Sequence, residues 1–153
     1  MPDAPNANSR IQPIRVLLVE DDSGEARFVQ WVLARCDSAR FEVTRVERLS
    51  EALPLAQSTH CDVMLLDLSR PDSLGLARLQ EFALAAPCTP IVVLTGLIEE
   101  STVLQAISHG AQDCLVKGRS DLNLLSRSMR FAIERKAFEV RLAKTADSRR
   151  QCA

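Results

Sequence analysis

The sequence predicts an α/β fold, a (βα)5 doubly wound five-stranded parallel sheet with an extended C-terminal helix. Five short runs rich in β-branched residues alternate with helical stretches. Four of the five runs are almost continuously apolar, which is typical of parallel strands buried on both faces. This alternation requires right-handed crossovers that place helices on both faces of the sheet. The strands are predicted at residues 16–19, 41–46, 63–66, 91–94 and 114–116.

The second run alternates between apolar and polar residues, so we expect it at an edge of the sheet. Ser23 is predicted to cap the first helix, which carries Phe28, Trp31 and Val32 at helical spacing. Ser50 opens the second helix, and Pro54 is expected in its first turn, where a missing N–H does little harm. Three more helices are predicted at 73–86, 99–108 and 121 to at least 143, with His109-Gly110 as the stop signal after the fourth.

The length of 153 residues suits one domain. We expect a flexible leader at 1–13, the domain at 14–135, and an extension of the last helix with a tail at 136–153. Residues 1–118 hold 10 Lys/Arg and 16 Asp/Glu, whereas residues 119–153 hold 9 and 4. The basic tail lacks aromatic or Gly-rich signatures, so we expect no nucleic-acid partner.

The five cysteines are scattered, without the spacing of metal ligands. They suit a reducing cytoplasm, where we expect the protein to reside. No apolar run reaches the length of about 18 residues that a membrane helix needs, so no membrane partner is expected.

Polar side chains follow four of the five predicted strands, and the carboxyl ends of parallel strands form the binding edge of such sheets. The first strand ends in Glu20-Asp21-Asp22, which is either a solvated loop or a site for a hard cation such as Mg²⁺. Asp22 is assigned to the loop, as an outer residue or a cap. Asp67 ends the most apolar strand, where a carboxylate is costly unless a metal or a lysine uses it.

A carboxylate at this place can also attack phosphorus as a nucleophile. Thr95-Gly96 follows the fourth strand and Lys117-Gly118 the fifth. Phosphoryl transfer needs neutralisation of the developing charge, which a lysine and a metal ion supply. The sequence therefore favours a phosphoryl site at this edge.

This set of residues resembles the receiver domains of two-component response regulators, over roughly residues 14–135. The resemblance implies a flavodoxin-like, CheY-like fold. It rests on Glu20-Asp21-Asp22, on Asp67 followed by Pro71 and Gly75, on Thr95-Gly96, on Gly110-Ala111 and on Leu115-Val116-Lys117.

The resemblance implies that Asp67 accepts a phosphoryl group from a histidine kinase or phosphotransfer protein with Mg²⁺ as cofactor. Asp21 would bind the ion directly, Glu20 through water, and the backbone carbonyl of Ser69 would complete the protein ligands with Asp67. Lys117 would pair with Asp67 and then with the phosphoryl oxygens, and Thr95 would move toward the phosphoryl group. Such a protein catalyses only its own phosphorylation and dephosphorylation, without a separate turnover substrate.

Two positions depart from the family pattern. Receivers usually carry Tyr or Phe three residues before the lysine and Pro directly after it, but this chain has Cys114 and Gly118. The first puts the aromatic half of the switch in doubt. The Leu-Val-Lys-Gly variant and the long last helix are similar to receivers that form the N-terminal part of larger signalling proteins.

The sequence leaves two other functions to consider. A pseudo-receiver that binds proteins without phosphorylation is supported by Cys114 alone. A phosphatase-type hydrolase would need a second carboxylate two residues after Asp67, where Ser69 stands, and no Gly-rich loop supports a flavin or dinucleotide site.

The last helix is longer than the fold needs. Leu124, Phe131 and Phe138 recur every seven residues. Either a surface helix frays beyond the sheet, or the helix forms a homodimer contact or a coiled linker. A homodimer through this helix, or through the face of the fourth helix, fifth strand and fifth helix, stays open at this point.

Overall fold

The computed structural model describes residues 12–58, 61–68, 73–96, 99–117 and 122–151. Within these ranges strands and helices alternate as predicted, and the chain has the flavodoxin-like α/β fold. The strands are β1 (Ile14–Val19), β2 (Phe41–Val46), β3 (Val63–Asp67), β4 (Ile91–Thr95) and β5 (Asp113–Val116). The helices are α1 (Ser23–Ala34), α2 (Leu49–Ser58), α3 (Ser73–Ala85), α4 (Glu100–Ser108) and α5 (Leu122–Gln151).

The five strands form one sheet in the order β2-β1-β3-β4-β5, and all neighbouring strands run parallel. β2 lies at an edge, as its alternating sequence predicted. The chain leaves β1 toward one side to form β2, and then crosses back to form β3 on the other side. The order therefore reverses between β1 and β3, and the carboxyl ends of these two strands flank the site that a doubly wound sheet provides.

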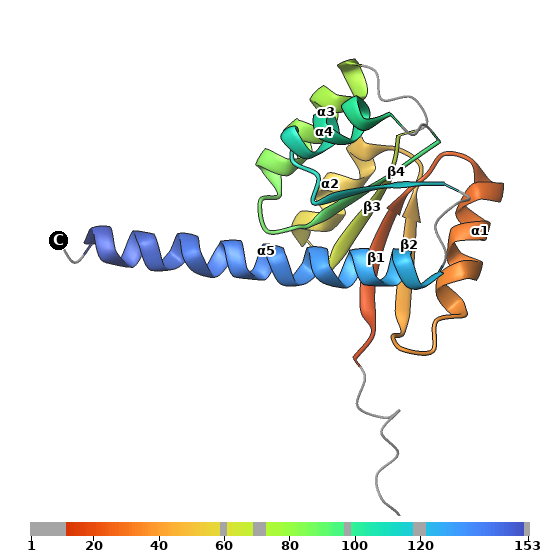
Figure 1. Cartoon of the computed structure of the whole chain (residues 1–153), viewed down its shortest axis with the longest axis horizontal. Helices are drawn as coiled ribbons and strands as arrows, with labels where there is room; N and C mark the ends of the chain where they lie inside the picture. The colour runs from red at the N-terminus through yellow and green to blue at the C-terminus, as the bar shows by residue number, and fades with distance from the viewer. Residues whose placement is uncertain (1–11, 59–60, 69–72, 97–98, 118–121, 152–153) are drawn as a thin grey trace, which may run out of the picture.

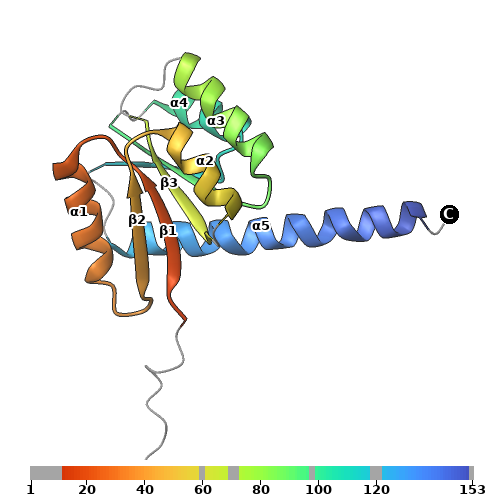
Figure 2. The ribbon, with the colours of Figure 1, turned by 180° about the vertical axis from the view of Figure 1, so that it is seen from behind.

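The core has two layers because the strands are buried on both faces. Along β1, Val16 and Leu18 pack with one cluster, whereas Leu17 and Val19 pack with the other. The first cluster includes residues of α1 and α5, and the second includes residues of α2, α3 and α4. Figures 1 and 2 show the same division, with α1 and α5 on one face of the sheet and α2, α3 and α4 on the other.

The start of α1 differs from the prediction. Asp22, not Ser23, is the N-cap, and its carboxylate accepts a hydrogen bond from the backbone N–H of Glu25 at 2.8 Å. Asp22 binds this N–H because a carboxylate at the N-cap satisfies a donor that has no partner within the helix. The role of Asp22 as a cap was one of the two that the sequence suggested.

The buried side of α1 also differs from the predicted one. Ala26 and Leu33 are buried, whereas Phe28 and Trp31 are each 55% exposed. The two rings stack on each other with centroids 6.3 Å apart, and the guanidinium of Arg35 lies over the Trp31 ring. Large apolar side chains at helical spacing therefore occur on the outer side of this helix, and the smaller Ala26 faces the sheet.

α2 and α4 begin within one residue of the predicted positions, but Pro54 does not lie where it was expected in α2. α2 begins at Leu49, so Pro54 is its sixth residue and lies beyond the first turn in which it was expected. α4 ends before His109 and Gly110, and Gly110 has a φ of 118°, a conformation that glycine adopts at helix ends.

α5 extends to Gln151 and projects far beyond the sheet, as Figure 1 shows. Its exposed apolar residues include Phe131, Phe138 and Leu142. No helix in the described part of the chain combines the length and the apolar character that crossing a membrane requires.

Candidate functional site

The strand register brings the predicted acidic residues together. Val19 lies beside Leu66 in the parallel pair of β1 and β3, so Glu20 follows β1 at the level of Asp67. On the other side, Asp67 lies beside Leu94 of β4. Two carboxylates thus meet at the point where the strand order reverses. Both are almost completely buried, since the side chain of Glu20 is 1% exposed and that of Asp67 is 2% exposed.

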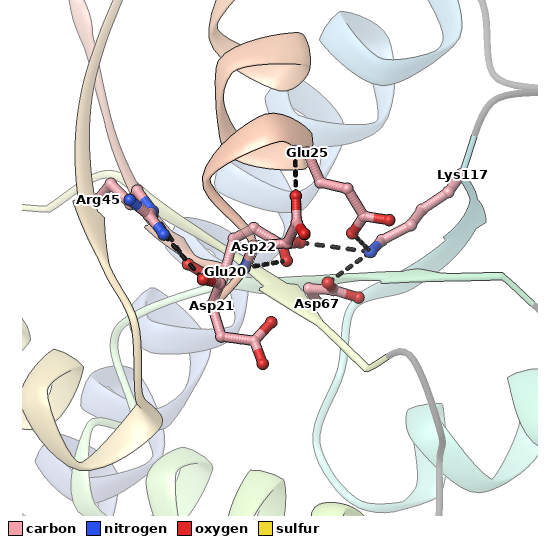
Figure 3. Close-up of polar contacts among 7 residues, drawn as sticks. All are labelled: Glu20, Asp21, Asp22, Glu25, Arg45, Asp67 and Lys117. Carbon is pink, nitrogen blue, oxygen red and sulfur yellow. Dashed lines mark hydrogen bonds and ion pairs between the residues drawn. The ribbon is translucent and has the colours of Figure 1, made fainter.

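Lys117 follows β5 and reaches this pair of carboxylates. Its backbone N–H donates to the carbonyl of Thr95 at 2.8 Å, which fixes the end of β5 against the end of β4. Its ammonium lies 3.3 Å from Oε2 of Glu20 and forms an ion pair with Oδ2 of Asp67. The contact between Asp67 and Lys117 that the sequence predicted is therefore present, and Figure 3 shows both side chains pointing toward each other.

Glu25 is a third carboxylate on the same ammonium. It lies in the first turn of α1, and its side chain is 52% exposed. Its Oε2 pairs with Lys117, and one oxygen each of Glu20, Glu25 and Asp67 lie within 4.8 Å of one another. Glu25 was not among the predicted site residues. The pattern Asp22-Ser-Gly-Glu25 instead indicates a capping role, because a Glu three residues after an N-cap commonly bonds back to it.

Burial and the neighbouring groups shift the pKa values of Glu20 and Lys117. Burial raises the pKa of the Glu20 carboxyl, and a hydrogen bond with Asp67 raises it further, to about 8. Burial lowers the pKa of Lys117, but the hydrogen bonds to Asp67 and Glu25 outweigh it, and the pKa rises above its ordinary value. The lysine is therefore a stable cation, and the Glu20 carboxyl holds a proton more readily than a solvated carboxyl does.

Arg45 holds the acidic loop from the edge strand. Its Nε donates to the carbonyl of Glu20 and its second guanidinium nitrogen to the carbonyl of Asp21, each at 3.0 Å. In the same loop, the backbone N–H of Asp22 donates to Oε1 of Glu20 at 3.0 Å. The sequence offered no signal for Arg45 beyond its place near the end of the second strand.

A cavity of about 230 Å³ lies beside the acidic pair. Its lining includes Glu20, Asp21 and Asp67, together with the two arginines Arg48 and Arg78. The Asp21 side chain points away from Lys117 (Figure 3) and is exposed. Three carboxylates at one cavity supply the oxygen ligands that Mg²⁺ prefers. Ser69, the fourth predicted contributor, lies outside the described residues, as do Pro71 and Gly118.

Thr95 is fully buried at the end of β4, next to Val116 in the pairing of β4 and β5. Cys114, which stands where the family usually has an aromatic residue, is half-buried and packs against the α2–α4 side of the core. Burial raises the pKa of its thiol.

Residues 16–130 match the model of the response regulator receiver domain. The chain belongs to this family. The receiver fold accounts for the strand order and for the acidic residues at the ends of β1 and β3.

Relatives with known roles agree with this assignment. The receiver is 35% identical over 104 residues to the cell cycle transcriptional regulator CtrA of Caulobacter vibrioides, and the match covers 68% of this chain and 44% of that protein. It is 32% identical over 114 residues to the cell cycle response regulator CtrA of Brucella ovis, which covers 74% of this chain and 48% of the relative. The receiver thus spans about half the length of these relatives.

Solved structures agree as well. A response regulator of Burkholderia pseudomallei with a phosphorylated aspartic acid, calcium ion and citrate is 28% identical, with a TM-score of 0.62, over 82% of this chain and 72% of the other. The receiver domain of the Francisella response regulator 1452 is 22% identical and shows the shared fold, with a TM-score of 0.64 over 81% of this chain and 98% of the other.

Proposed function

We propose that this receiver is a phospho-acceptor switch, in which Asp67 accepts a phosphoryl group from a histidine kinase or phosphotransfer protein with Mg²⁺. The observation that carries the proposal is the ion pair between Lys117 and the buried carboxylate of Asp67, beside Glu20. A buried carboxylate needs such a partner, and a phosphoryl group placed on it would find the same cation within reach.

The proposed chemistry is a transfer between two nucleophiles. An oxygen of Asp67 attacks phosphorus, so that an O–P bond forms while the P–N bond to the donor imidazole breaks. The electron pair of the broken bond stays on the imidazole nitrogen. The product is an acyl phosphate on Asp67, and hydrolysis by water later restores the carboxylate. Lys117 stays beside the phosphoryl oxygens and offsets their negative charge.

The donor set fits Mg²⁺. Glu20, Asp21 and Asp67 line one cavity, and carboxylate oxygens are the ligands that this ion takes in phosphoryl-transfer sites. We infer that Asp21 and Asp67 hold the ion, that Glu20 contributes through water, and that the carbonyl of Ser69 adds a ligand. When bound, Mg²⁺ would neutralise charge that develops on the phosphoryl oxygens.

Thr95 is the proposed link to the rest of the domain. It is buried at the end of β4, and its carbonyl binds the backbone N–H of Lys117. A shift of its side chain toward the phosphoryl group would alter packing near β5 and α4. The Burkholderia pseudomallei relative supports the class of chemistry, since that protein carries a phosphorylated aspartic acid and a calcium ion.

The second partner in this proposal is another copy of the same chain. α5 presents exposed apolar residues beyond the sheet, and α4 presents Leu104 and Ile107. We propose that a second copy of the chain covers one of these faces. Sedimentation of the native chain and of Phe138→Glu tests it, because a charge at this contact would return a dimer to monomer. A native chain that sediments as a monomer at all concentrations contradicts it.

We place the receiver in the cytoplasm as part of the same proposal, because the cysteines in the described part of the chain are free thiols.

The deciding experiment is phosphorylation in vitro. The protein is incubated with Mg²⁺ and acetyl phosphate, and its mass is measured beside Asp67→Asn and beside Asp37→Asn, a matched change at an exposed aspartate. We expect a gain of one phosphoryl group in the native chain and in Asp37→Asn, and none in Asp67→Asn or without Mg²⁺. A folded native chain that gains no mass would point to the phosphorylation-independent binding module.

A further inference from the structure

Glu25 differs from Glu20, Asp67 and Lys117 because it does not lie at the end of a strand. It comes from the first turn of α1, it is half-exposed, and its carboxylate still meets the ammonium of Lys117. Figure 3 shows Glu25 approaching the ammonium from the helix side, while Asp67 approaches it from the sheet. The contact therefore joins α1 to the end of β5.

The local hydrogen bonds explain why this carboxylate reaches the site. In a capping box, the Glu three residues after the N-cap bonds back to the N–H of the N-cap. Here the N–H of Asp22 donates to Oε1 of Glu20 at 3.0 Å, while the N–H of Glu25 donates to Asp22 at 2.8 Å. Glu20 thus takes the place that Glu25 would hold in a capping box, and the Glu25 side chain turns to Lys117.

The ammonium has three N–H donors, and three carboxylates are available to use them. They belong to Glu20, Glu25 and Asp67. A phosphoryl oxygen that binds Lys117 must therefore displace one of them. Glu20 and Asp67 are buried, so the release of either would leave a buried carboxyl oxygen that contacts neither water nor the ammonium. Glu25 is half-exposed, so its release into water costs least.

We propose that Glu25 is a positioning residue that holds Lys117 in the resting receiver and competes with the incoming phosphoryl group for it. This inference rests on the proposed function. Two effects of Glu25 act in the same direction: its carboxylate occupies a donor of Lys117, and its charge repels an anionic donor. Loss of the contact should accelerate phosphorylation at low donor concentration.

The test compares Glu25→Gln with the native chain and with Glu81→Gln, a matched charge removal at an exposed site in α3. The donor is acetyl phosphate with saturating Mg²⁺. In this reaction an Asp67 oxygen bonds to phosphorus, the P–O bond to the acetyl group breaks, and acetate leaves with the electron pair. The initial rate is measured as a function of donor concentration.

We expect Glu25→Gln to raise the rate at low donor concentration about two- to fivefold, the range that loss of a half-exposed ion pair spans. The gain should come from a lower half-saturating donor concentration, with a similar maximal rate. Glu81→Gln should match the native chain. An unchanged or slower Glu25→Gln overturns the proposal, as does a loss of Mg²⁺ affinity in calorimetry that exceeds the gain in rate, since Glu25 would then serve the metal.

Glu25→Asp separates contact from charge. It keeps the charge and the backbone donor to Asp22, but its side chain is one methylene shorter, so we expect its contact with Lys117 to weaken. Faster phosphorylation of this variant supports a role through contact. A rate equal to that of the native chain overturns it, because net charge alone would then explain Glu25→Gln.

A spectroscopic measurement separates this inference from the proposed function. The ¹⁵N signal of the Lys117 ammonium is recorded without donor or Mg²⁺, and Glu25→Gln should shift it and speed its hydrogen exchange, whereas Glu81→Gln should not. If the native chain accepts no phosphoryl group but this signal shifts, the proposed function fails and the contact stands. If the signal stays unmoved, the inference fails whatever the phosphorylation result.

Discussion

The guanidinium of Arg45 donates to the backbone carbonyl of Glu20 over 3.0 Å, so the edge strand β2 holds the residue that follows the interior strand β1. A second bond of the same length reaches the carbonyl of Asp21. Arg45→Met keeps much of the apolar stem and removes both donors. We expect the free energy of unfolding to fall by about 1–2 kcal/mol, since both bonds have a charged donor and the one to Glu20 is partly buried.

The same variant should also bind Mg²⁺ several-fold more weakly, because the backbone that carries Asp21 is less well fixed. Calorimetric titration with Mg²⁺ measures this change, and urea unfolding measures the stability. Arg141→Met, an exposed position on α5, serves as the control and should alter neither quantity. Equal Mg²⁺ affinity in Arg45→Met and the native chain would contradict a role in holding the acidic loop.

The raised pKa of Glu20 predicts the pH dependence of stability without metal. Burial and the hydrogen bond with Asp67 raise this pKa from 4.5 to about 8 in the folded protein. A raised folded-state pKa contributes stability that is fully present below pH 4.5 and is lost as pH rises through about 8. In a chelating buffer, the native chain should therefore melt at a lower temperature at about pH 9 than at about pH 6.

Glu20→Gln has no charge to bury, so this part of the pH dependence should disappear. The loss of each 1 kcal/mol lowers the Tm of a domain of this size by roughly 2–4 °C. Thermal unfolding of both proteins across this pH range measures the effect. A variant whose Tm falls with pH as steeply as that of the native chain would show that other groups cause the dependence.

Much of this site could be predicted because the residues end strands. Asp67, Thr95 and Lys117 each follow an apolar run, and parallel strands bring such positions to one edge whatever the side-chain details. Glu25 and Arg45 could not be found in this way. Each of these side chains contacts a residue that lies beyond its own helix or strand. Neither the spacing of residues in the sequence nor its composition predicts such a contact.

The helix faces show a second limit of the sequence. Phe28 and Trp31 have the spacing of a buried stripe, yet they are exposed, and Ala26 faces the sheet. Periodicity shows which residues share a face of a helix, but not which face meets the core. The edge position of β2 was easier to predict, since its alternating sequence differs from the nearly continuous apolar runs of the interior strands.

Ser128 and Asp113 join α5 to β5, the strand that Lys117 directly follows. The hydroxyl of Ser128 donates to Oδ2 of Asp113 at 2.6 Å, and Ser128 is buried. Ser128→Ala would leave a half-buried carboxylate oxygen without this donor. We expect a loss of about 1–3 kcal/mol in urea unfolding.

A double-mutant cycle with Asp113→Ala isolates this pair. The double variant should be less destabilised than the sum of the single variants, with a coupling of about 0.5–3 kcal/mol. Simple additivity would mean that the two side chains do not interact in solution.

Gly110 ends α4 in a conformation that other residues rarely adopt, with a φ of 118°. A Cβ added there would also lie 2.6 Å from Cβ of Ala83 in α3, and neither backbone can move away cheaply. Gly110→Ala therefore combines backbone strain with a clash between two helices. We expect it to lower the free energy of unfolding by about 1–3 kcal/mol, the usual cost of a non-glycine residue in this region.

Gly96→Ala provides the matched control for this substitution. Gly96 lies directly after β4, and an added Cβ would meet no atom within 4 Å. Its stability should stay within about 0.5 kcal/mol of the native chain, as for surface substitutions without special features. Urea unfolding of the two variants side by side separates the two sites. The φ of Gly110 and the contact with Ala83 both predict that Gly110→Ala is less stable than Gly96→Ala. If the two variants are equally stable, α3 and α4 must move apart to accommodate the added methyl group.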